Sequence, residues 1–147
     1  MTDKVLITGA AGFIGYKLAC DLYENTDCEL YLVDSFARGR KDEYFSHLID
    51  DPRVHFKEGD VNNPQFFESL PEVQWIFHFA ALVGVKNVQQ NPEQVLRTNT
   101  LSVFWIIDYA RRCSNFRKLV FSSTSEVYAG TLENFTMQIP TPEQTPL

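Results

Sequence analysis

The most constraining feature of this sequence is a glycine-rich turn between a predicted strand and a predicted helix. Residues 4–8 form a short run of β-rich side chains, and glycines follow at positions 9, 12 and 15. Apolar side chains then recur at helical spacing, at Phe13, Ile14, Leu18, Ala19 and Leu22. The segment therefore predicts a strand, a tight turn and a helix.

Each glycine of this turn has a physical reason for its position. Gly9 permits a tight turn, Gly12 lets the backbone approach a pyrophosphate, and Gly15 allows the helix to pack closely on the sheet. The amino end of the helix then faces the phosphates of a dinucleotide. A turn that serves packing alone is the alternative, but the strand before it and the helix after it favour a dinucleotide loop. The predicted cofactor contacts here are Gly9, Ala11, Gly12, Phe13, Ile14 and Gly15.

Strand and helix patterns alternate along the rest of the chain. Strands are predicted at 29–33, 54–57, 73–80 and 118–122, and helices at 41–49, at 64–70 and from 91 onward. Five strands joined by helical crossovers imply an α/β fold whose parallel sheet is covered on both faces. Asn91 as N-cap, Pro92 and Glu93 mark the start of the last helix. From Glu126 onward no period remains, and a loop is predicted.

Composition fits one domain and excludes several classes of function. The 147 residues, 44% of them hydrophobic, suit a single domain over 1–147. The net charge of −6 and the scattered basic residues argue against nucleic acid as a partner. No apolar run approaches the roughly 20 residues that cross a bilayer, so no membrane association is expected. Three cysteines without metal-ligand spacing, and no charged and apolar leader, predict a reduced cytoplasmic protein without a metal site.

Asp34 ends the second predicted strand, 19 residues after Gly15. A carboxylate at this point accepts hydrogen bonds from the adenosine ribose of NAD and repels the 2′-phosphate of NADP. An ordinary strand-end aspartate that caps a loop is the alternative. Ser35 and Arg38 follow in the same loop and belong to the predicted site, although an arginine such as Arg38 or Arg40 can accommodate a 2′-phosphate. NAD is therefore favoured over NADP.

Five motifs in order give the chain a family resemblance. They are T-G-A-A-G-F-I-G at 8–15, V-D at 33–34, G-D-V at 59–61, H-F-A-A at 78–81 and S-S-T-S-E-V-Y at 122–128. With them the sequence resembles the extended short-chain dehydrogenase/reductase family, specifically its sugar-nucleotide epimerases, dehydratases and decarboxylases. The resemblance implies a Rossmann-type doubly wound parallel sheet of about five strands in the order 3-2-1-4-5.

Matching the family position by position implies further cofactor contacts. Without the resemblance, Asp60 would be a turn aspartate and Asn99 a solvated or locally bonded helix residue. His78 lies between apolar residues on a buried strand and is interpreted as a hydrogen-bonded core histidine, not a catalytic base. The contacts that the resemblance implies are Asp60 and Val61 beside the adenine, Phe79, Ala80 and Ala81 after the fourth strand, Asn99 on the following helix, and Ser122.

Residues 122–126 lie where the fifth strand ends, at the sheet edge where ligands bind in open parallel sheets. The resemblance implies that Thr124 bonds the reacting sugar hydroxyl. It also implies that Ser125 and Glu126 act in later steps, with Glu126 as a general acid or base. This chemistry begins when a sugar hydroxyl loses its proton while hydride passes to NAD, which gives a keto intermediate. A polar strand-to-loop transition, whose hydroxyls cap backbone groups, is the alternative.

The family's catalytic pair, a tyrosine followed four residues later by a lysine, has no match in this sequence. Ala129 also stands where the family usually has a glycine after Tyr128. The chain is therefore predicted to be the NAD-binding portion of such an enzyme, ending before the catalytic pair and the substrate domain, and inactive alone. A free-standing, non-catalytic dinucleotide-binding module is the alternative. A third hypothesis is that another polypeptide supplies the missing pair.

Two partners are expected. The full-length enzyme would bind a nucleotide sugar, as the resemblance implies. The helix over 92–113 carries apolar residues on more than one face, which predicts self-association as a homodimer through this helix. The apolar positions are Val103, Phe104, Ile106, Ile107 and Ala110.

Overall fold

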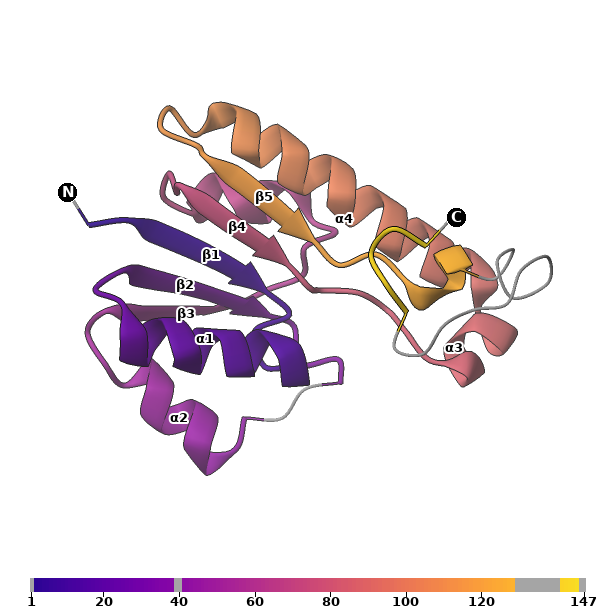
Figure 1. The fold of residues 1–147 in the computed structure, drawn as a ribbon, viewed down its shortest axis with the longest axis horizontal. Helices are drawn as coiled ribbons and strands as arrows, with labels where there is room; N and C mark the ends of the chain where they lie inside the picture. The colour runs from indigo at the N-terminus through magenta and orange to yellow at the C-terminus, as the bar shows by residue number, and fades with distance from the viewer. Residues whose placement is uncertain (1, 39–40, 129–140, 146–147) are drawn as a thin grey trace.

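A computed structural model describes residues 2–38, 41–128 and 141–145. They contain a five-stranded sheet in which every neighbouring pair is parallel, in the order β3-β2-β1-β4-β5 (Figure 1). The predicted α/β class, the Rossmann-type sheet and its strand order are therefore confirmed. The strands are β1 (Lys4–Thr8), β2 (Glu29–Asp34), β3 (Val54–Glu58), β4 (Trp75–His78) and β5 (Lys118–Phe121).

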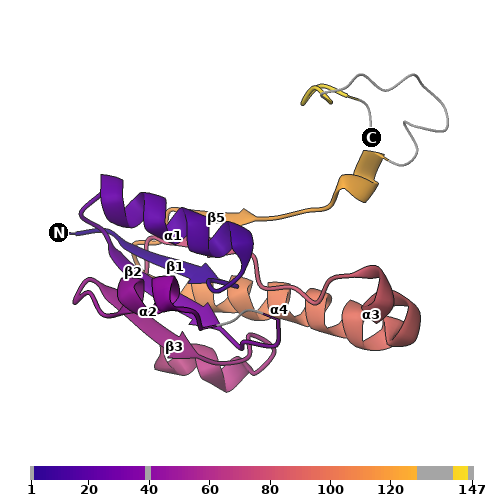
Figure 2. The same cartoon turned by 90° about the horizontal axis from the view of Figure 1, so that it is seen from below.

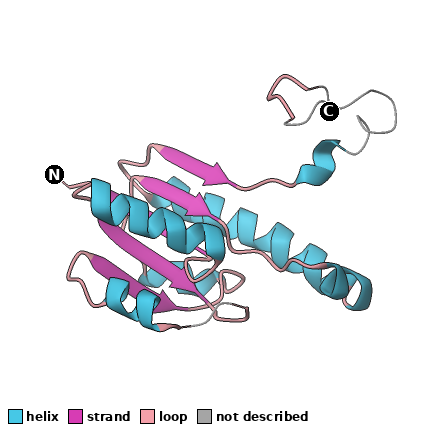
Figure 3. Cartoon of the chain, turned by 60° about the horizontal axis from the view of Figure 1, so that its bottom comes forward, coloured by secondary structure: helices cyan, strands magenta, loops and turns pink. Residues whose placement is uncertain are grey.

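Helices lie on both faces of this sheet (Figure 3). α1 (Phe13–Asn25) and α2 (Glu43–Ile49) pack on one face, whereas α4 (Pro92–Arg112) and the 3₁₀ helix η1 (Pro64–Ser69) pack on the other. Alternation along β1 accounts for the two layers, because successive side chains of a strand point to opposite faces. Val5 and Ile7 belong to the cluster under α1 and α2, and Leu6 belongs to the cluster under α4.

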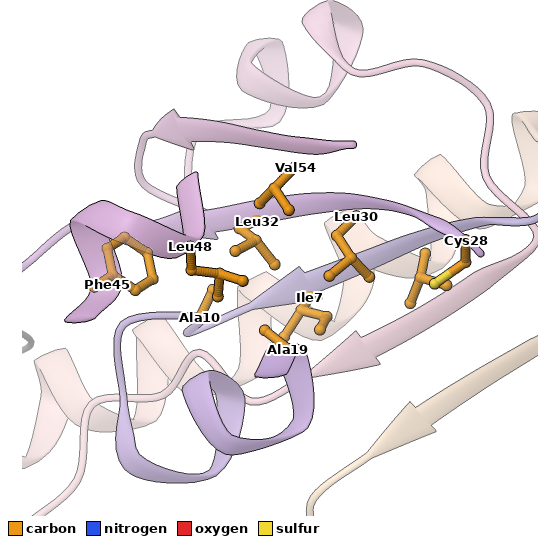
Figure 4. Close-up of a cluster of buried hydrophobic side chains, with 10 residues drawn as sticks. Ile7, Ala10, Ala19, Cys28, Leu30, Leu32, Phe45, Leu48 and Val54 are labelled. Carbon is orange, nitrogen blue, oxygen red and sulfur yellow. The ribbon is translucent and has the colours of Figure 1, made fainter. Parts of the chain in front are cut away.

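The cluster under α1 and α2 fixes the part of the sheet that precedes the glycine-rich turn. Figure 4 shows side chains from three strands and both helices meeting in it. Burying each of its large apolar side chains contributes about 2 kcal/mol relative to exposure. Its labelled members are Ile7, Ala10, Ala19, Cys28, Leu30, Leu32, Phe45, Leu48 and Val54.

The direction of strand addition reverses at β1. The chain builds from β1 through β2 to β3 on one side, and β4 and β5 are then added on the other side of β1. The connections that leave β1 and β4 therefore diverge, which opens a crevice at the carboxyl ends of these strands. The glycine-rich turn, between the end of β1 and the start of α1, lies at this crevice.

Two short helices were not predicted. α3 (Val85–Gln90) precedes α4, and the 3₁₀ helix η2 (Ser125–Tyr128) lies in the segment predicted as a loop, beyond the end of β5 (Figure 2). Asn91 is the N-cap of α4, as predicted, but within the described chain its side chain makes no capping bond. The backbone N–H of Asn91 instead closes α3 on Asn87, and its carbonyl accepts the N–H of Val95. Among the described residues, no helix is both long and apolar enough to span a bilayer.

Candidate functional site

A cleft of about 810 Å³ opens at the carboxyl ends of the strands. Its walls come from the loops that follow all five strands and from the first turns of α1 and α4. This volume lies in the range of cofactor sites. The predicted cofactor residues that line it are Gly9, Ala11, Gly12, Phe13, Ile14, Gly15, Asp34, Ser35, Arg38, Asp60, Val61, Phe79, Ala80, Ala81 and Ser122.

The three glycines of the turn do different work. Gly9 has a positive φ of 71°, and a Cβ on it would lie 2.7 Å from the backbone nitrogen of Ala80. A Cβ on Gly15 would overlap the carbonyl oxygen of Gly9. Packing therefore requires a glycine at both positions, which agrees, for these two residues, with the alternative that the turn serves packing. Gly12 differs, because the nearest atom to its Cβ would be the Gly9 oxygen at 3.1 Å.

The amino end of α1 faces this cleft without a side-chain cap. Gly12 is the N-cap, and within the described residues no side chain bonds to the first N–H groups of the helix. The following side chains, Phe13 and Ile14, are 91% and 58% exposed. Free N–H groups and the helix dipole favour an anion such as a phosphate at this point.

Asp34 ties the end of β2 to the glycine turn. Its Oδ2 accepts the N–H of Ala11 at 2.9 Å, and its Oδ1 accepts the N–H of Phe36 at 2.8 Å. Phe36 has a φ of 52°, a costly conformation for a residue with a side chain. Its ring packs against Phe45 and Phe56, and these contacts hold the sharp turn after β2. Each carboxylate oxygen keeps a further acceptor site that a ribose hydroxyl can use.

Arg38 connects two loops that face each other across the cleft. Its Nη1 donates to the carbonyl oxygen of Val83 at 3.3 Å. Ser35 stands between Asp34 and this arginine, and its hydroxyl accepts the N–H of Ala37 at 3.4 Å. Arg40, the second arginine considered at this loop, lies outside the described residues.

Asp60 lies in a turn at the edge of the cleft. It lines the cleft, and its Oδ1 also accepts the backbone N–H of Asn62 at 2.8 Å, as expected of a turn aspartate. The neighbouring Val61 is buried and lines the cleft as well. The backbone of Gly59 donates to the carbonyl of Asp34 at 3.0 Å, which joins this turn to the end of β2.

Asn99 is the one predicted cofactor residue that does not line the cleft. Its Oδ1 accepts the N–H of Leu82 at 2.8 Å, and its Nδ2 donates to the carbonyl of Leu82 at 3.0 Å. The amide is thus paired with the loop after β4. These bonds join α4 to a loop 17 residues away, so Asn99 is neither solvated nor locally bonded, and it holds the loop that lines the cleft.

His78, at the end of β4, is a core histidine, as predicted. The residue is 1% exposed and lies within hydrogen-bonding distance of two buried hydroxyl groups, those of Thr8 and Ser102. Desolvation lowers the pKa of His78 from 6.5 to about 4. The imidazole is therefore neutral near pH 7.

The end of β5 is less enclosed. Ser122 and Ser123 line the cleft, but Thr124 and Glu126 are exposed and do not. The Thr124 hydroxyl accepts the backbone N–H of Glu126 at 3.2 Å, so it caps the first turn of η2. Ser125 is the first residue of η2, and Ala129 lies outside the described residues.

Sequence reasoning missed several residues of the cleft. Gln94 and Thr98 reach it from α4, the helix on which the resemblance had marked Asn99 alone. The others are sequence neighbours of predicted residues, and three of them, Val33, Gly59 and Ser123, belong to the quoted motifs. The missed lining residues are Val33, Ala37, Gly59, Asn62, Leu82, Val83, Gln94, Thr98 and Ser123.

Relatives of this chain are nucleotide-sugar enzymes. UDP-glucuronic acid decarboxylase 1 of Arabidopsis thaliana is 33% identical over 131 residues, which cover 89% of this chain and 28% of the relative. UDP-glucuronic acid decarboxylase 1 of Danio rerio is 34% identical over 125 residues, covering 85% and 28%. The chain thus spans less than a third of the length of these two relatives.

Solved structures of two epimerases have the same fold. The UDP-Glc/GlcNAc 4-epimerase of Campylobacter jejuni superimposes with a TM-score of 0.77 and 30% identity, covering 99% of this chain and 43% of that one. UDP-glucose 4-epimerase of Bifidobacterium longum, in complex with NAD+ and UDP, gives a TM-score of 0.80 and 26% identity, covering 97% and 42%.

The family model named "NAD dependent epimerase/dehydratase family" matches residues 5–147. This match covers the described strands, the glycine turn and the cleft. It confirms the resemblance inferred from the five motifs, and it agrees with the prediction of NAD as the cofactor, because the family is NAD-dependent. The chain therefore belongs to the NAD-dependent epimerase/dehydratase family.

Proposed function

We propose that this chain binds NAD in the cleft and forms the cofactor-binding part of a sugar-nucleotide epimerase, dehydratase or decarboxylase. The observation that carries this proposal is the direct bond between the Asp34 carboxylate and the N–H of Ala11. This bond brings a ribose acceptor and a phosphate-binding turn to one point of the cleft.

The fit to NAD rests on three parts of the cleft. The pyrophosphate would lie at Gly12, which lines the cleft at the uncapped end of α1, where an anion is favoured. The adenosine ribose would bond Asp34, whose charge disfavours the 2′-phosphate of NADP. The adenine would lie beside Asp60 and Val61, and Ser122 would contact the cofactor at the end of β5.

The substrate chemistry is assigned to residues 124–126. When bound, NAD would accept a hydride from a sugar carbon that carries a hydroxyl group, and the hydroxyl proton would pass to the family's catalytic tyrosine, which has no match in this sequence; the product would be a transient keto sugar. Because the Thr124 hydroxyl already accepts the N–H of Glu126, its hydrogen is free to be donated to a sugar oxygen. The exposed carboxylate of Glu126 would then exchange a proton with the keto sugar, and Ser125 is proposed to assist this later step.

The substrate class follows from the relatives. Their names specify UDP-glucuronic acid, UDP-glucose and UDP-N-acetylglucosamine chemistry. We propose a nucleotide sugar, with UDP as the nucleotide, as the substrate of the enzyme to which this chain belongs.

Self-association through α4 is a further part of the proposal. The helix buries Ser102, Ile106 and Tyr109 against the sheet, whereas Leu96 and Phe104 are 70% and 59% exposed. These exposed apolar side chains support a homodimer through the helix. Analytical ultracentrifugation tests this point, and a monomer at all concentrations would count against it.

Calorimetric titration of the chain with NAD and with NADP tests the cofactor proposal. We expect NAD to bind more tightly than NADP. Gly12→Ala should weaken NAD binding and should lower stability less than Gly15→Ala does, because its Cβ would lie 3.1 Å from the Gly9 oxygen, a milder contact than at Gly15. Lys17→Ala, on the exposed surface of α1, is the matched control and should bind as the unaltered chain does. Binding of neither dinucleotide, or a preference for NADP, would refute the proposal.

A further inference from the structure

The loop that follows β4 forms one wall of the cleft without regular secondary structure. Every residue from 79 to 83 lines the cleft. Its backbone is held mainly by other elements. The N–H of Phe79 bonds the Thr8 carbonyl at 3.1 Å, and the N–H of Ala80 lies 3.3 Å from the Thr8 hydroxyl. At the other end, both polar backbone groups of Leu82 pair with the Asn99 amide.

His78 connects these two attachments through the core. Its Nδ1 lies 2.7 Å from the Thr8 hydroxyl, and its Nε2 lies 3.2 Å from the Ser102 hydroxyl. The Ser102 hydroxyl in turn lies 3.4 Å from the carbonyl oxygen of Asn99. Thr8, His78 and Ser102 are each no more than 1% exposed, so water does not compete for these bonds.

Of the two directions that the tautomers of His78 allow, one gives every donor and acceptor in this series a partner. The Thr8 hydroxyl accepts the N–H of Ala80, and its own hydrogen is donated to Nδ1 of His78. A neutral imidazole must then carry its proton on Nε2, which donates to Ser102. The Ser102 hydrogen is left for the Asn99 carbonyl. Each hydroxyl thus donates once and accepts once.

We propose that His78 is a positioning residue for cofactor binding, which acts as the Nε2–H tautomer within a hydrogen-bonded circuit that starts at Ala80 and returns through Asn99 to Leu82. This inference rests on the proposed NAD function of the cleft. The circuit fixes the position of residues 79–83 relative to the sheet. These residues form the wall of the cleft that would contact the cofactor. Burial keeps the ring neutral because it lowers the pKa of His78 to about 4.

The glycine turn depends on the same loop. A Cβ on Gly9 would lie 2.7 Å from the nitrogen of Ala80 and 2.8 Å from the carbonyl carbon of Phe79, so the two backbones are in direct contact. A displacement of the loop therefore displaces the turn that is proposed to hold the pyrophosphate. For this reason the circuit acts on both walls of the cleft.

The tautomer is tested without any cofactor. In a chain with ¹⁵N-labelled histidine, long-range ¹H–¹⁵N correlation distinguishes a protonated ring nitrogen from an acceptor nitrogen. We expect an acceptor Nδ1 and a protonated Nε2 for His78 at pH 7. A proton on Nδ1, or a rapidly exchanging mixture of the two forms, would overturn the circuit.

The positioning role is tested with variants that remove one hydroxyl each. Thr8→Val and Ser102→Ala should each weaken NAD binding by about fivefold, the worth of about one hydrogen bond, and should speed hydrogen exchange at the amides of Ala80 and Leu82. Because both act through one circuit, the double variant should weaken binding by less than the product of the two effects. Thr8→Ser, which keeps the hydroxyl, should restore affinity.

Tyr109→Phe is the matched control. Tyr109 lies near the carboxyl end of α4, away from Asn99 and Ser102. The substitution removes the hydrogen bond from its hydroxyl to the Pro71 carbonyl. It should lower the free energy of unfolding and leave NAD affinity unchanged. Equal affinities in the Thr8→Val, Ser102→Ala and control variants would contradict the positioning role. If the unaltered chain binds no NAD, the proposed function fails, and the tautomer and the two amide exchange rates still decide whether the circuit exists.

Discussion

The carboxyl ends of β2 and β5 are organised in different ways. At β2, both oxygens of Asp34 accept backbone N–H groups, and one of these belongs to a loop 23 residues away. At β5, Thr124 and Glu126 are exposed, and the bond between them spans only two residues. Contacts between distant elements therefore preorganise the proposed cofactor side, whereas the segment assigned to substrate chemistry is held by a local bond.

This difference implies that cofactor affinity and substrate chemistry can be separated by substitution. Preorganised groups give affinity because little conformational entropy is lost when the ligand binds. Changes at the glycine turn, at His78 or at Asp34 should therefore alter folding or NAD binding. Changes at residues 124 and 126 should leave both nearly intact.

Gly15→Ala should have the largest effect, because it directly disrupts the glycine turn on the proposed cofactor side of the cleft. The added Cβ would overlap the Gly9 carbonyl and approach Ala10 Cα to 2.9 Å. We expect a loss of about 3 kcal/mol in the free energy of unfolding and no measurable NAD binding. Urea unfolding and calorimetry provide these values. Near-normal stability would mean that the turn is not tightly packed.

A fall in pH should lower the free energy of unfolding through the protonation of His78. The folded chain holds this ring neutral down to about pH 4, whereas an unfolded histidine is protonated near pH 6.5. The unfolded state therefore binds more protons in this window. The contribution of the neutral His78 ring to the free energy of unfolding should be fully present above pH 6.5. It should be lost, by about 3 kcal/mol, as the pH falls to 4.

The substitution His78→Asn separates this contribution from other titrations. The variant should be less stable at pH 7, and the slope of stability between pH 6.5 and 5 should be reduced. His47→Gln, at an exposed site of α2, serves as the control and should retain the slope. Unfolding curves at several pH values measure both, and an unchanged slope in His78→Asn would contradict the assignment.

Asp34→Asn should have a moderate effect. An amide oxygen can replace one carboxylate acceptor, but its NH₂ group faces the other backbone N–H. We expect a loss of about 2 kcal/mol in stability and about tenfold weaker NAD binding. Asp42→Asn, which keeps the N-cap of α2 on Phe45, is the matched control and should change neither. Unaltered NAD affinity in Asp34→Asn would remove this residue from the site.

Thr124→Ala and Glu126→Gln should have the smallest effects. Both side chains are exposed and lie outside the cleft, so each change should alter stability by less than about 0.5 kcal/mol and leave NAD affinity unchanged. Calorimetry on the two variants checks this expectation. A large loss of NAD affinity in either variant would show that the end of β5 takes part in cofactor binding.

The sequence predicted the fold well because its signals are local. Alternating strand and helix patterns identified the five strands, and the crossovers implied parallel pairing. α3 escaped prediction because its six polar and β-branched residues, VKNVQQ, are too short for a periodic signal. The absent side-chain cap at Asn91 has a related origin, since the backbone of this residue closes α3 and opens α4 at once.

The residues that line the candidate site were predicted largely from motifs. The hydrogen bonds and packing contacts that hold those residues in place were not predicted. Residues on the loops after β1 to β4 line the cleft as expected. The roles of Asn99 and His78 depend on partners 17 and 70 residues away, Leu82 and Thr8, and no periodicity encodes such pairings. The packing roles of Gly9 and Gly15 likewise became visible only with neighbouring backbones in place.

NAD is proposed to bind the described cleft through the loops that follow β1, β2 and β4. Amide chemical-shift mapping of the ¹⁵N-labelled chain during an NAD titration tests this proposal most directly. We expect the largest shifts at Gly12, Ala11 and Ala80, with little change at Val127 in η2. No shifts, or shifts concentrated away from the carboxyl ends of the strands, would contradict it.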